Sequence, residues 1–327
     1  MHVLMVGTGS IGRRHMASLR RLVPEVHFDV LREDGRSRDV SELGEVTVSS
    51  SLSEAVAKRP DLMVIANPSS MHLRFLLAAI EHGIPFYAEK PLLTDAAELQ
   101  ALQAAVATAG AALPVNIVGC NLRFLPSLRE LHRTVTSGEL GTVVRASFEA
   151  GQWLPDWRPT QDYRQSYSAR RELGGGVLFD LIHEIDAARW ILGDFSSVQA
   201  QLARCSSLEI ETEDSACLLL RAQRGALATV QLDYVSRRSF RRYRVVGDQA
   251  SAEWDLPSRT LTITGPEGAR LVDLGDAAFD VSATYIEAMR ELLNAIAHRV
   301  PTAQPVSEGI ASLGIVMQAY AQQPLLS

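Results

Sequence analysis

The chain is poor in lysine, in cysteine and in long apolar runs, and each shortage narrows the range of functions that the chain can have. Only two of the 32 basic residues are lysines, Lys58 and Lys90, so each of them is more informative than a lysine usually is. Cys120, Cys205 and Cys217 lie far apart with no Cys-x-x-Cys pair, which favours a reducing compartment over a zinc or disulfide framework. No apolar run approaches the ~20 residues that cross a bilayer, so we expect no membrane partner.

A basic excess is also missing. The 327 residues carry a formal net charge of −6, whereas nucleic-acid-binding domains usually show a basic stripe, so we expect no nucleic-acid partner. Hydrophobic residues at 46% and charged residues at 21% are typical of a soluble enzyme, and the length predicts two domains. The first apolar run begins at residue 3, so we expect no cleavable signal peptide and a cytoplasmic location.

Residues 1–120 alternate short apolar runs with helical patterns. We expect strands at 3–6, 27–31, 46–48, 61–66, 86–88 and 114–119, and helices at 13–22, 52–59, 71–82 and 96–109. Continuous apolar runs of this length suit strands that are buried on both faces. Their alternation with helices predicts an α/β Rossmann domain with a doubly wound parallel sheet.

Residues 121–327 show a different pattern. We expect helices at 124–137, directly after Gly174-Gly175-Gly176, at 282–298 and at 308–321, and strands at 143–150, 197–205, 214–221, 226–236, 240–246, 251–255 and 260–264. The run of strands joined by polar turns predicts an α+β domain with an open, mainly antiparallel sheet. We assign substrate binding and oligomerisation to it, as a homodimer or homotetramer.

The first predicted strand runs directly into Gly7-x-Gly9-x-x-Gly12, which opens the first helix. In this motif Gly7 allows a tight turn, Gly9 lets the backbone approach a pyrophosphate, and Gly12 permits close packing of helix on strand. The helix start at Ser10 and Ile11 offers N–H groups and the positive dipole end to phosphate. The motif in this context predicts a dinucleotide site.

The end of the second predicted strand bears on the choice of cofactor. A carboxylate there binds the ribose 2′-hydroxyl of NAD, and an arginine suits the 2′-phosphate of NADP. We place Arg32 at this end, with Arg36 and Arg38 close behind, and favour NADP over NAD. Asp29 and Glu33 are neighbouring carboxylates, so NAD stays open, as does a solvated polar loop.

Four motifs together resemble the glucose–fructose oxidoreductase and inositol dehydrogenase (Gfo/Idh/MocA) family, along essentially the whole chain. They are the glycine turn at 7–15, Asn67-Pro68-Ser69 with His72, Glu89-Lys90-Pro91, and Gly174-Gly175-Gly176-x-x-x-Asp180-x-x-His183-x-x-Asp186. Members are mostly NAD(P)-dependent dehydrogenases or reductases of sugars and cyclitols. The resemblance implies cofactor contacts at Asn67, Pro68, His72, Glu89, Lys90 and Asn121, although His15 and His72 also suit packing at helix starts.

Lys90 is the first candidate catalytic residue. It follows a predicted strand at the carboxyl edge of the sheet, where ligands of open α/β sheets bind. An ammonium group there can hydrogen-bond a substrate hydroxyl and stabilise negative charge that develops on oxygen. The alternative is a surface lysine before a proline.

Asp180 and His183 are the other two candidate catalytic residues. Three residues apart on one predicted helix, they are expected on one helix face. An imidazole, with an ordinary pKa near 6.5, suits proton transfer to or from a hydroxyl, and Asp180 or Asp186 can orient it. The alternative is a capping aspartate with a structural histidine. The commoner family spacing is four residues, which makes the role of Asp180 less certain than that of His183.

Substrate contacts are expected from the aromatic and basic loop at 151–173. We assign them to Trp153, Tyr163, Arg164, Tyr167 and Arg170, together with Arg123, Asp180 and His183. Aromatic faces stack on sugar C–H groups, and arginines pair with carboxylate or phosphate. The loop resembles a family branch associated with bacterial surface sugars, and it is expected to be a substrate lid or an arm that packs on a neighbouring subunit.

A second basic group follows the predicted strand at 226–236. Arg237, Arg238, Arg241, Arg242 and Arg244 are spaced closely enough to hold a nucleotide diphosphate. A solvated sheet face or an oligomer contact is the alternative that we favour.

These patterns predict an NAD(P)-dependent oxidoreductase that transfers a hydride between the nicotinamide and a hydroxyl or keto carbon of a sugar, nucleotide sugar or cyclitol, without a metal. Two alternatives stay open. One is a glycosidase-type enzyme that retains NAD and oxidises its substrate transiently. The other is a non-catalytic sensor of NAD(P) or sugar, which the presence of Lys90, Asp180 and His183 makes less favourable.

Overall fold

The computed structural model describes residues 1–33 and 41–323, so Arg36 and Arg38 lie outside the described residues. The chain divides into two compact units. The first comprises Met1–Asn121 and Ala283–Ile310, and the second comprises Leu122–Ser282 and Ala311–Ser327. Each unit is described by itself.

The first unit is built on a six-stranded sheet in the order β3-β2-β1-β4-β5-β6. Its strands are β1 (His2–Val6), β2 (His27–Leu31), β3 (Thr47–Ser49), β4 (Leu62–Ile65), β5 (Phe86–Ala88) and β6 (Asn116–Val118). Every neighbouring pair is parallel. The order reverses between β1 and β4, which is where ligands of doubly wound sheets bind. The predicted Rossmann fold is confirmed.

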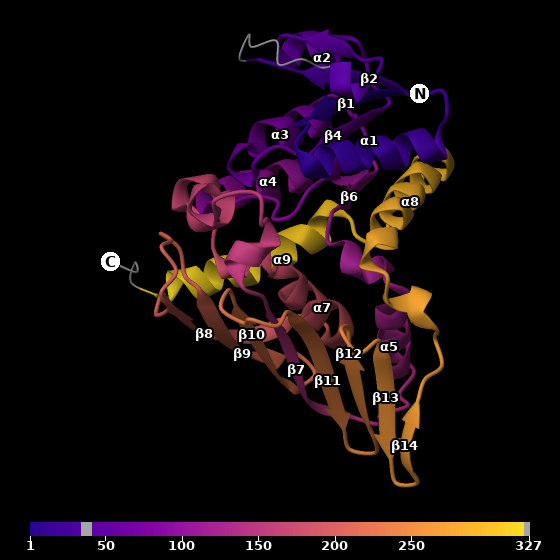
Figure 1. The fold of residues 1–327 in the computed structure, drawn as a ribbon. Coiled ribbons are helices and arrows are strands. Elements are labelled where there is room, and N and C mark those ends of the chain that lie inside the picture. The colour runs from indigo at the N-terminus through magenta and orange to yellow at the C-terminus, as the bar shows by residue number, and fades with distance from the viewer. Residues whose placement is uncertain (34–40, 324–327) are drawn as a thin grey trace. The chain divides into compact units, whose positions relative to one another are not determined.

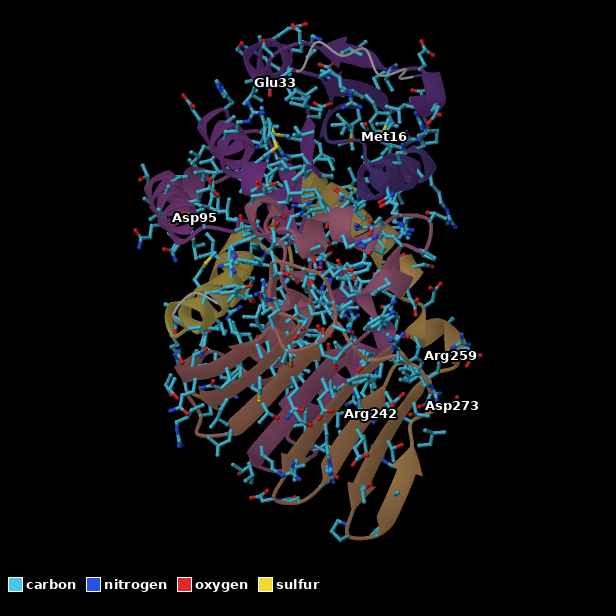
Figure 2. The ribbon with its side chains drawn as sticks, turned by 60° about the vertical axis from the view of Figure 1, so that its left-hand side comes forward. Met16, Glu33, Asp95, Arg242, Arg259 and Asp273 are labelled. Carbon is cyan, nitrogen blue, oxygen red and sulfur yellow. The ribbon has the colours of Figure 1, made fainter. Side chains whose placement is uncertain are left out.

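Helices cover both faces of this sheet, with α1 beside α8 and α3 beside α4 (Figure 1). The helices are α1 (Ser10–Leu22), α2 (Leu52–Ala57), α3 (Leu73–Glu81), α4 (Ala96–Ala109) and α8 (Thr284–His298). Met16 and Leu19 of α1 are buried against the sheet (Figure 2). Asp95 starts α4 because its carboxylate accepts hydrogen bonds from the Ala97 and Glu98 N–H groups.

The last stretch of the first unit comes from far along the chain. The first crossing between the units follows Asn121, and α8 and the start of α9 (Val306–Ala321) pack with the N-terminal residues. The physical reason lies in α1, on which α8 packs: the Arg14 guanidinium lies over the Tyr285 ring, 4.6 Å from its centroid. Sequence order alone gives no signal for this return.

The second unit contains an eight-stranded sheet in the order β14-β13-β12-β11-β7-β10-β9-β8. Its strands are β7 (Val143–Gly151), β8 (Phe195–Ala203), β9 (Ser215–Ala222), β10 (Leu227–Asp233), β11 (Phe240–Gly247), β12 (Ser251–Asp255), β13 (Thr260–Gly265) and β14 (Gly268–Leu271). Among these described strands only β7 and β10 pair in parallel, so the mainly antiparallel sheet is confirmed. The sequence analysis missed β14, whose four residues are all exposed.

One face of the second sheet packs on α5 (Pro126–Thr136) and α7 (Ile182–Leu192). Along β9 buried and accessible residues alternate, as expected for a sheet with one covered face. The other face carries ion pairs such as Arg242–Asp255, and Arg242 projects from it (Figure 2). No helix in the described part of the chain has the length and apolar character to span a bilayer.

The single helix predicted after the glycine triplet is in fact two helices. The short α6 (Val177–Asp180) ends at Asp180, and α7 begins at Ile182. Between them Leu181 leaves the helical conformation, with φ −101° and ψ 32°. The prediction that Asp180 and His183 share one face of a continuous helix is therefore wrong.

Candidate functional site

The glycine turn after β1 has the shape that the motif predicts. Gly7 has φ +94°, and a Cβ there would lie 2.5 Å from the Asn67 backbone nitrogen. A Cβ on Gly12 would lie 2.2 Å from the Gly7 carbonyl oxygen. A Cβ on Gly9, by contrast, would have no atom of the described residues within 4 Å, so the backbone there is open to approach. The turn is thus tight on its inner side and open where a pyrophosphate would lie.

Asn67, which follows β4 on the edge beside this turn, supports the same assignment. Both polar atoms of its side-chain amide are buried, and neither has a hydrogen-bond partner within the described residues. Its carbonyl oxygen is held by His72, whose Nε2 lies 2.9 Å away, while Nδ1 lies 3.0 Å from the Leu92 carbonyl oxygen. Burial lowers the pKa of His72. His72 therefore packs, as one reading predicted, and holds Asn67 at the turn.

Helix α1 begins with Ser10, Ile11 and Gly12. The residue before it, Gly9, has no side chain that could accept a hydrogen bond from the first N–H groups of the helix. The first turn of α1, which the structure describes in full, contains no acidic residue that would oppose an anion. Together with the open backbone at Gly9 and the buried amide of Asn67, these features fit a dinucleotide with its pyrophosphate at the α1 start.

Arg32 lies at the end of β2, as predicted, and its guanidinium reaches back to the glycine turn. One terminal nitrogen donates to the Thr8 hydroxyl, and the other donates to the Leu31 carbonyl oxygen, 3.3 Å away. Glu33, the next residue, which is labelled in Figure 2, forms an ion pair with Arg74 of α3.

Asp29, the other carboxylate near this strand end, is completely buried. Its Oδ2 accepts hydrogen bonds from the Ser49 hydroxyl at 2.6 Å and the Lys58 ammonium at 3.1 Å. Lys58, one of the two lysines, is thereby accounted for as a structural partner. Both carboxylates that favoured NAD in the sequence are thus engaged by basic side chains.

Glu89 of the Glu-Lys-Pro motif ties the end of β5 to α1. Its Oε1 lies 2.6 Å from His15 Nε2, and the His15 ring packs on the Tyr87 ring with centroids 4.4 Å apart. A Cβ on Gly119 would lie 3.0 Å from Glu89 Oε2, which favours a glycine there. His15 is a packing residue, as predicted, and Glu89 holds its ring through this contact. Lys90 follows at the carboxyl edge of the sheet, after β5.

Asn121, which the resemblance placed at the cofactor, is 2% exposed. Its Nδ2 donates to Thr284 Oγ1 at 2.6 Å, so it anchors the start of α8. Pro68 begins the turn that leads to His72 and α3. The candidate cofactor residues therefore share one edge of the first sheet, where Asn121 and His72 hold backbone segments in place.

Asp180 in the second unit is buried and held by tyrosines. The Tyr234 hydroxyl donates to Asp180 Oδ2 at 2.6 Å, and Tyr167 from the 151–173 loop also hydrogen-bonds this carboxylate. Burial raises the pKa of both tyrosines, and the Asp180 charge adds to the rise. Both hydroxyls thus remain donors to Asp180. Sequence analysis missed Tyr234, because nothing local links it to a residue 54 positions earlier.

His183, in the first turn of α7, is half-buried, unlike Asp180. Its neighbour Glu184 is fully buried and accepts hydrogen bonds from Arg241 Nε at 2.5 Å and the Tyr243 hydroxyl at 3.0 Å. These contacts fix the rotation of α7, with Glu184 directed to the sheet. Because adjacent helix residues point about 100° apart, His183 is turned away from Glu184.

A cavity of about 160 Å³ borders the break between α6 and α7. Leu181 from the break contributes to its wall, as do the polar residues Gln152, Ser239 and Arg241 at the ends of β7 and β11. Phe240, Leu256 and Pro257 supply apolar wall. Mixed apolar and hydrogen-bonding walls are what a sugar requires of a binding site.

Arg123, which was predicted to contact substrate, is buried in the second unit. It forms a two-pronged ion pair with Asp186 of α7, at 2.8 Å from Nε and 2.7 Å from Nη2. The two side chains are 5% and 2% exposed, and the Ser312 hydroxyl also donates to Asp186, at 2.9 Å. Asp186 thus accepts hydrogen bonds from both Arg123 and Ser312.

The loop at 151–173 is anchored within its own unit. Arg164 pairs with Glu209 at 3.3 Å and Arg170 with Glu211 at 3.0 Å. The Tyr163 hydroxyl accepts a hydrogen bond from the Glu209 N–H at 3.2 Å. Both arginines thus already have carboxylate partners, so a substrate anion would have to compete for them. The lid function stays a prediction.

The second basic group is largely neutralised. Arg242 pairs with Asp255, Arg244 with Glu253 and Arg241 with the buried Glu184. Arg237 stacks on Trp153, with its guanidinium carbon 3.6 Å from the ring centroid. This arrangement disfavours a diphosphate site and places Trp153 under a cation.

Two family comparisons match most of the chain. Residues 1–117 match the GFO/IDH/MocA profile described as an oxidoreductase family with an NAD-binding Rossmann fold. Residues 128–253 match the GFO/IDH/MocA C-terminal domain.

Individual relatives are distant. Inositol 2-dehydrogenase 3 of Saccharopolyspora erythraea is 26% identical over 80% of this chain and 75% of its own length. Levoglucosan dehydrogenase of Pseudarthrobacter phenanthrenivorans is 27% identical over 62% of this chain and 54% of its own length. Among solved structures, the WlbA dehydrogenase of Bordetella pertussis with NADH and UDP-GlcNAcA has a TM-score of 0.80 at 17% identity, covering 98% of this chain and 94% of that one. At that identity the likeness concerns the fold alone.

Proposed function

Since the chain belongs to the GFO/IDH/MocA family of NAD-binding oxidoreductases, we propose that it transfers a hydride between a nicotinamide dinucleotide and a hydroxyl or keto carbon of a sugar, nucleotide sugar or cyclitol. The observation that carries the proposal is the turn at Gly7–Gly12 beside the buried amide of Asn67, which has hydrogen-bonding capacity to offer a ligand. Inositol and levoglucosan dehydrogenases among the relatives support the substrate class.

We assign the proton chemistry to Lys90 and His183. When bound, the dinucleotide supplies the ring that accepts or gives the hydride. The Lys90 ammonium hydrogen-bonds the reacting oxygen and stabilises its negative charge, and the His183 imidazole removes the hydroxyl proton or returns it. Asp180, held by Tyr167 and Tyr234, supports this segment from within. A direct contact of Asp180 with substrate is the weaker assignment.

NADP is the cofactor that we favour. Arg32 lies at the end of β2, and the two carboxylates that would bind a ribose 2′-hydroxyl are engaged by Arg74 and Lys58. NAD binding by relatives argues the other way for the family at large. A cytoplasmic location and a homodimer or homotetramer belong to the same proposal.

The test is a panel of sugars, nucleotide sugars and cyclitols, offered with NAD⁺ and with NADP⁺ while the absorbance of the reduced nicotinamide is followed. We expect turnover with at least one class, and loss of that turnover in the Lys90→Met variant. A protein that copurifies with its cofactor and cleaves a glycoside, with no net change in the redox state of that cofactor, would favour the glycosidase-type alternative. Binding of cofactor and sugar without any reaction would favour the sensor.

A further inference from the structure

Two buried carboxylates and three tyrosine hydroxyls form a cluster in the second unit, of which the proposed function uses Asp180 and the two tyrosines that hold it. The second carboxylate belongs to Glu213, which is 3% exposed and lies just before β9. The hydroxyls come from Tyr167 of the 151–173 loop, Tyr234 after β10 and Tyr320 of α9. A buried carboxylate that no motif predicts calls for a function.

Glu213 holds the first turn of α6, the helix that carries Asp180. Its Oε1 accepts hydrogen bonds from the Tyr320 hydroxyl at 2.7 Å and from the Leu178 N–H at 3.1 Å. Its own carbonyl oxygen accepts one from the Val177 N–H at 3.4 Å. α6 contains four residues, so these contacts bear on half of its backbone.

Gly176, the last glycine of the triplet, leaves the space that the Glu213 carboxylate occupies. Gly176 has φ +127°, and a Cβ there would lie 2.5 Å from Glu213 Oε1 and 2.7 Å from the Tyr320 hydroxyl. A side chain at this position would displace the carboxylate from the helix start. Gly176 and Glu213 therefore depend on each other structurally, although they lie far apart in the sequence.

The groups around Glu213 set its charge. Asp180 faces it from α6 and Tyr320 from α9, Tyr234 lies within reach of both carboxylates, and Arg171 acts on Tyr320 from the loop. Burial raises the pKa of Glu213 to about 7, the hydrogen bonds from Tyr320 and Leu178 oppose that rise, and the Asp180 charge adds to it. Glu213 thus changes charge at neutral pH.

We propose that Glu213 is a positioning residue for the catalytic segment, and that its ionised carboxylate fixes the α6 start while its protonated form relaxes it. A carboxylate accepts stronger hydrogen bonds from Tyr320 and Leu178 than a neutral acid does. The hold passes along α6 to Asp180 and to the break at Leu181 that precedes His183. This inference rests on the proposed function for its effect on turnover.

The test compares wild type with Glu213→Gln, which is isosteric and cannot ionise, as a ratio of kcat across pH 5.5–9 (a range chosen to bracket pH ~7). We expect a ratio near one at low pH that rises to about tenfold above pH 8 through a single ionisation, with KM within about twofold. The ratio removes ionisations common to both proteins, His183 included. Glu213→Asp, which retains an ionisable carboxylate, should give a ratio that varies with pH much less than that of Glu213→Gln. Glu253→Gln, on the open sheet face, is the matched control and should stay at one.

A ratio that does not vary with pH would overturn the proposal and leave Glu213 a structural residue. A second measurement needs no turnover, so it separates this inference from the proposed function. The Leu178 amide ¹H–¹⁵N resonance should titrate near pH 7 in wild type and lose that titration in Glu213→Gln. A Leu178 resonance that titrates alike in both proteins would contradict the hold, whether or not a sugar is ever turned over.

Discussion

Replacing Arg123 by methionine tests whether this arginine stabilises the fold or binds substrate. Its guanidinium forms two hydrogen bonds of 2.7 and 2.8 Å to Asp186, and both side chains are almost fully buried. Arg123→Met keeps most of the side-chain volume but leaves a buried, uncompensated carboxylate. Removing one partner of such a pair costs about 3–5 kcal/mol, since the desolvated charge loses its neutralising partner.

Two further variants, Asp186→Asn and the double variant, test whether the two charges depend on each other for stability. Asp186→Asn alone leaves a buried guanidinium, and it should also be destabilising. In Arg123→Met/Asp186→Asn neither charge remains, and Ser312 can still donate to the amide oxygen. We therefore expect the double variant to be more stable than Arg123→Met, with a coupling energy of about 2 kcal/mol or more.

Urea unfolding monitored by tryptophan fluorescence suits the measurement, because Trp190 stacks on His132 at 4.2 Å and lies 5.8 Å from the Arg123 guanidinium. Turnover of each variant is measured without urea, at a temperature where all are folded. If Arg123→Met loses less than about 1 kcal/mol and instead raises KM for the sugar, Arg123 is a substrate ligand and the structural account fails.

Lys90→Met should lower kcat by about 10²–10⁴-fold with cofactor affinity nearly unchanged, and near-normal turnover would remove Lys90 from the mechanism. Arg32→Ala should weaken NADP binding in fluorescence titrations much more than NAD binding; a wild type that binds NAD equally well would refute the preference. His183→Ala should abolish the fall of kcat/KM at low pH, and His183→Asn should be nearly as slow because it cannot transfer a proton. Glu213 has a folded-state pKa raised from 4.5 to about 7, so its contribution to stability is fully present below pH 4.5 and is lost as the pH rises to 7. Glu213→Gln should flatten that decline, by an amount on the order of 3 kcal/mol, and unfolding curves that stay equally pH-dependent would contradict the assignment.

Local patterns predicted the first unit well. The apolar runs of β1 and β4 are buried along their length, and the three glycines that mark the turn lie within six positions of one another. Such signals need no knowledge of distant partners. The same holds for the alternation along β9, which indicated the second sheet.

What the sequence could not predict depends on contacts between distant residues. The break at Leu181 separates Asp180, bound by Tyr234, from His183, and no helical pattern shows a hydrogen bond across 54 residues. Arg123 was predicted to bind substrate because its partner Asp186 lies 63 residues away, and no local pattern indicates that the two residues pair. Glu213 belongs to no sequence motif, and its contact with Gly176 is recognised only in the folded structure.

The return of α8 to the first unit makes residues 122–282 an insertion between two stretches of that unit, and the second unit also takes in the chain from Ala311 onward. Asn121 and Thr284 flank this insertion and are hydrogen-bonded to each other, so the chain leaves and rejoins the Rossmann unit at one place. A fragment cut at residue 120 would lack α8 and expose the part of α1 that it covers. Joining 121 to 283 through a few flexible residues would instead preserve that packing. The first unit is therefore interrupted at a single point by residues 122–282, and any exchange of that insertion has to keep the second connection, which runs through α9 from Ile310 to Ala311.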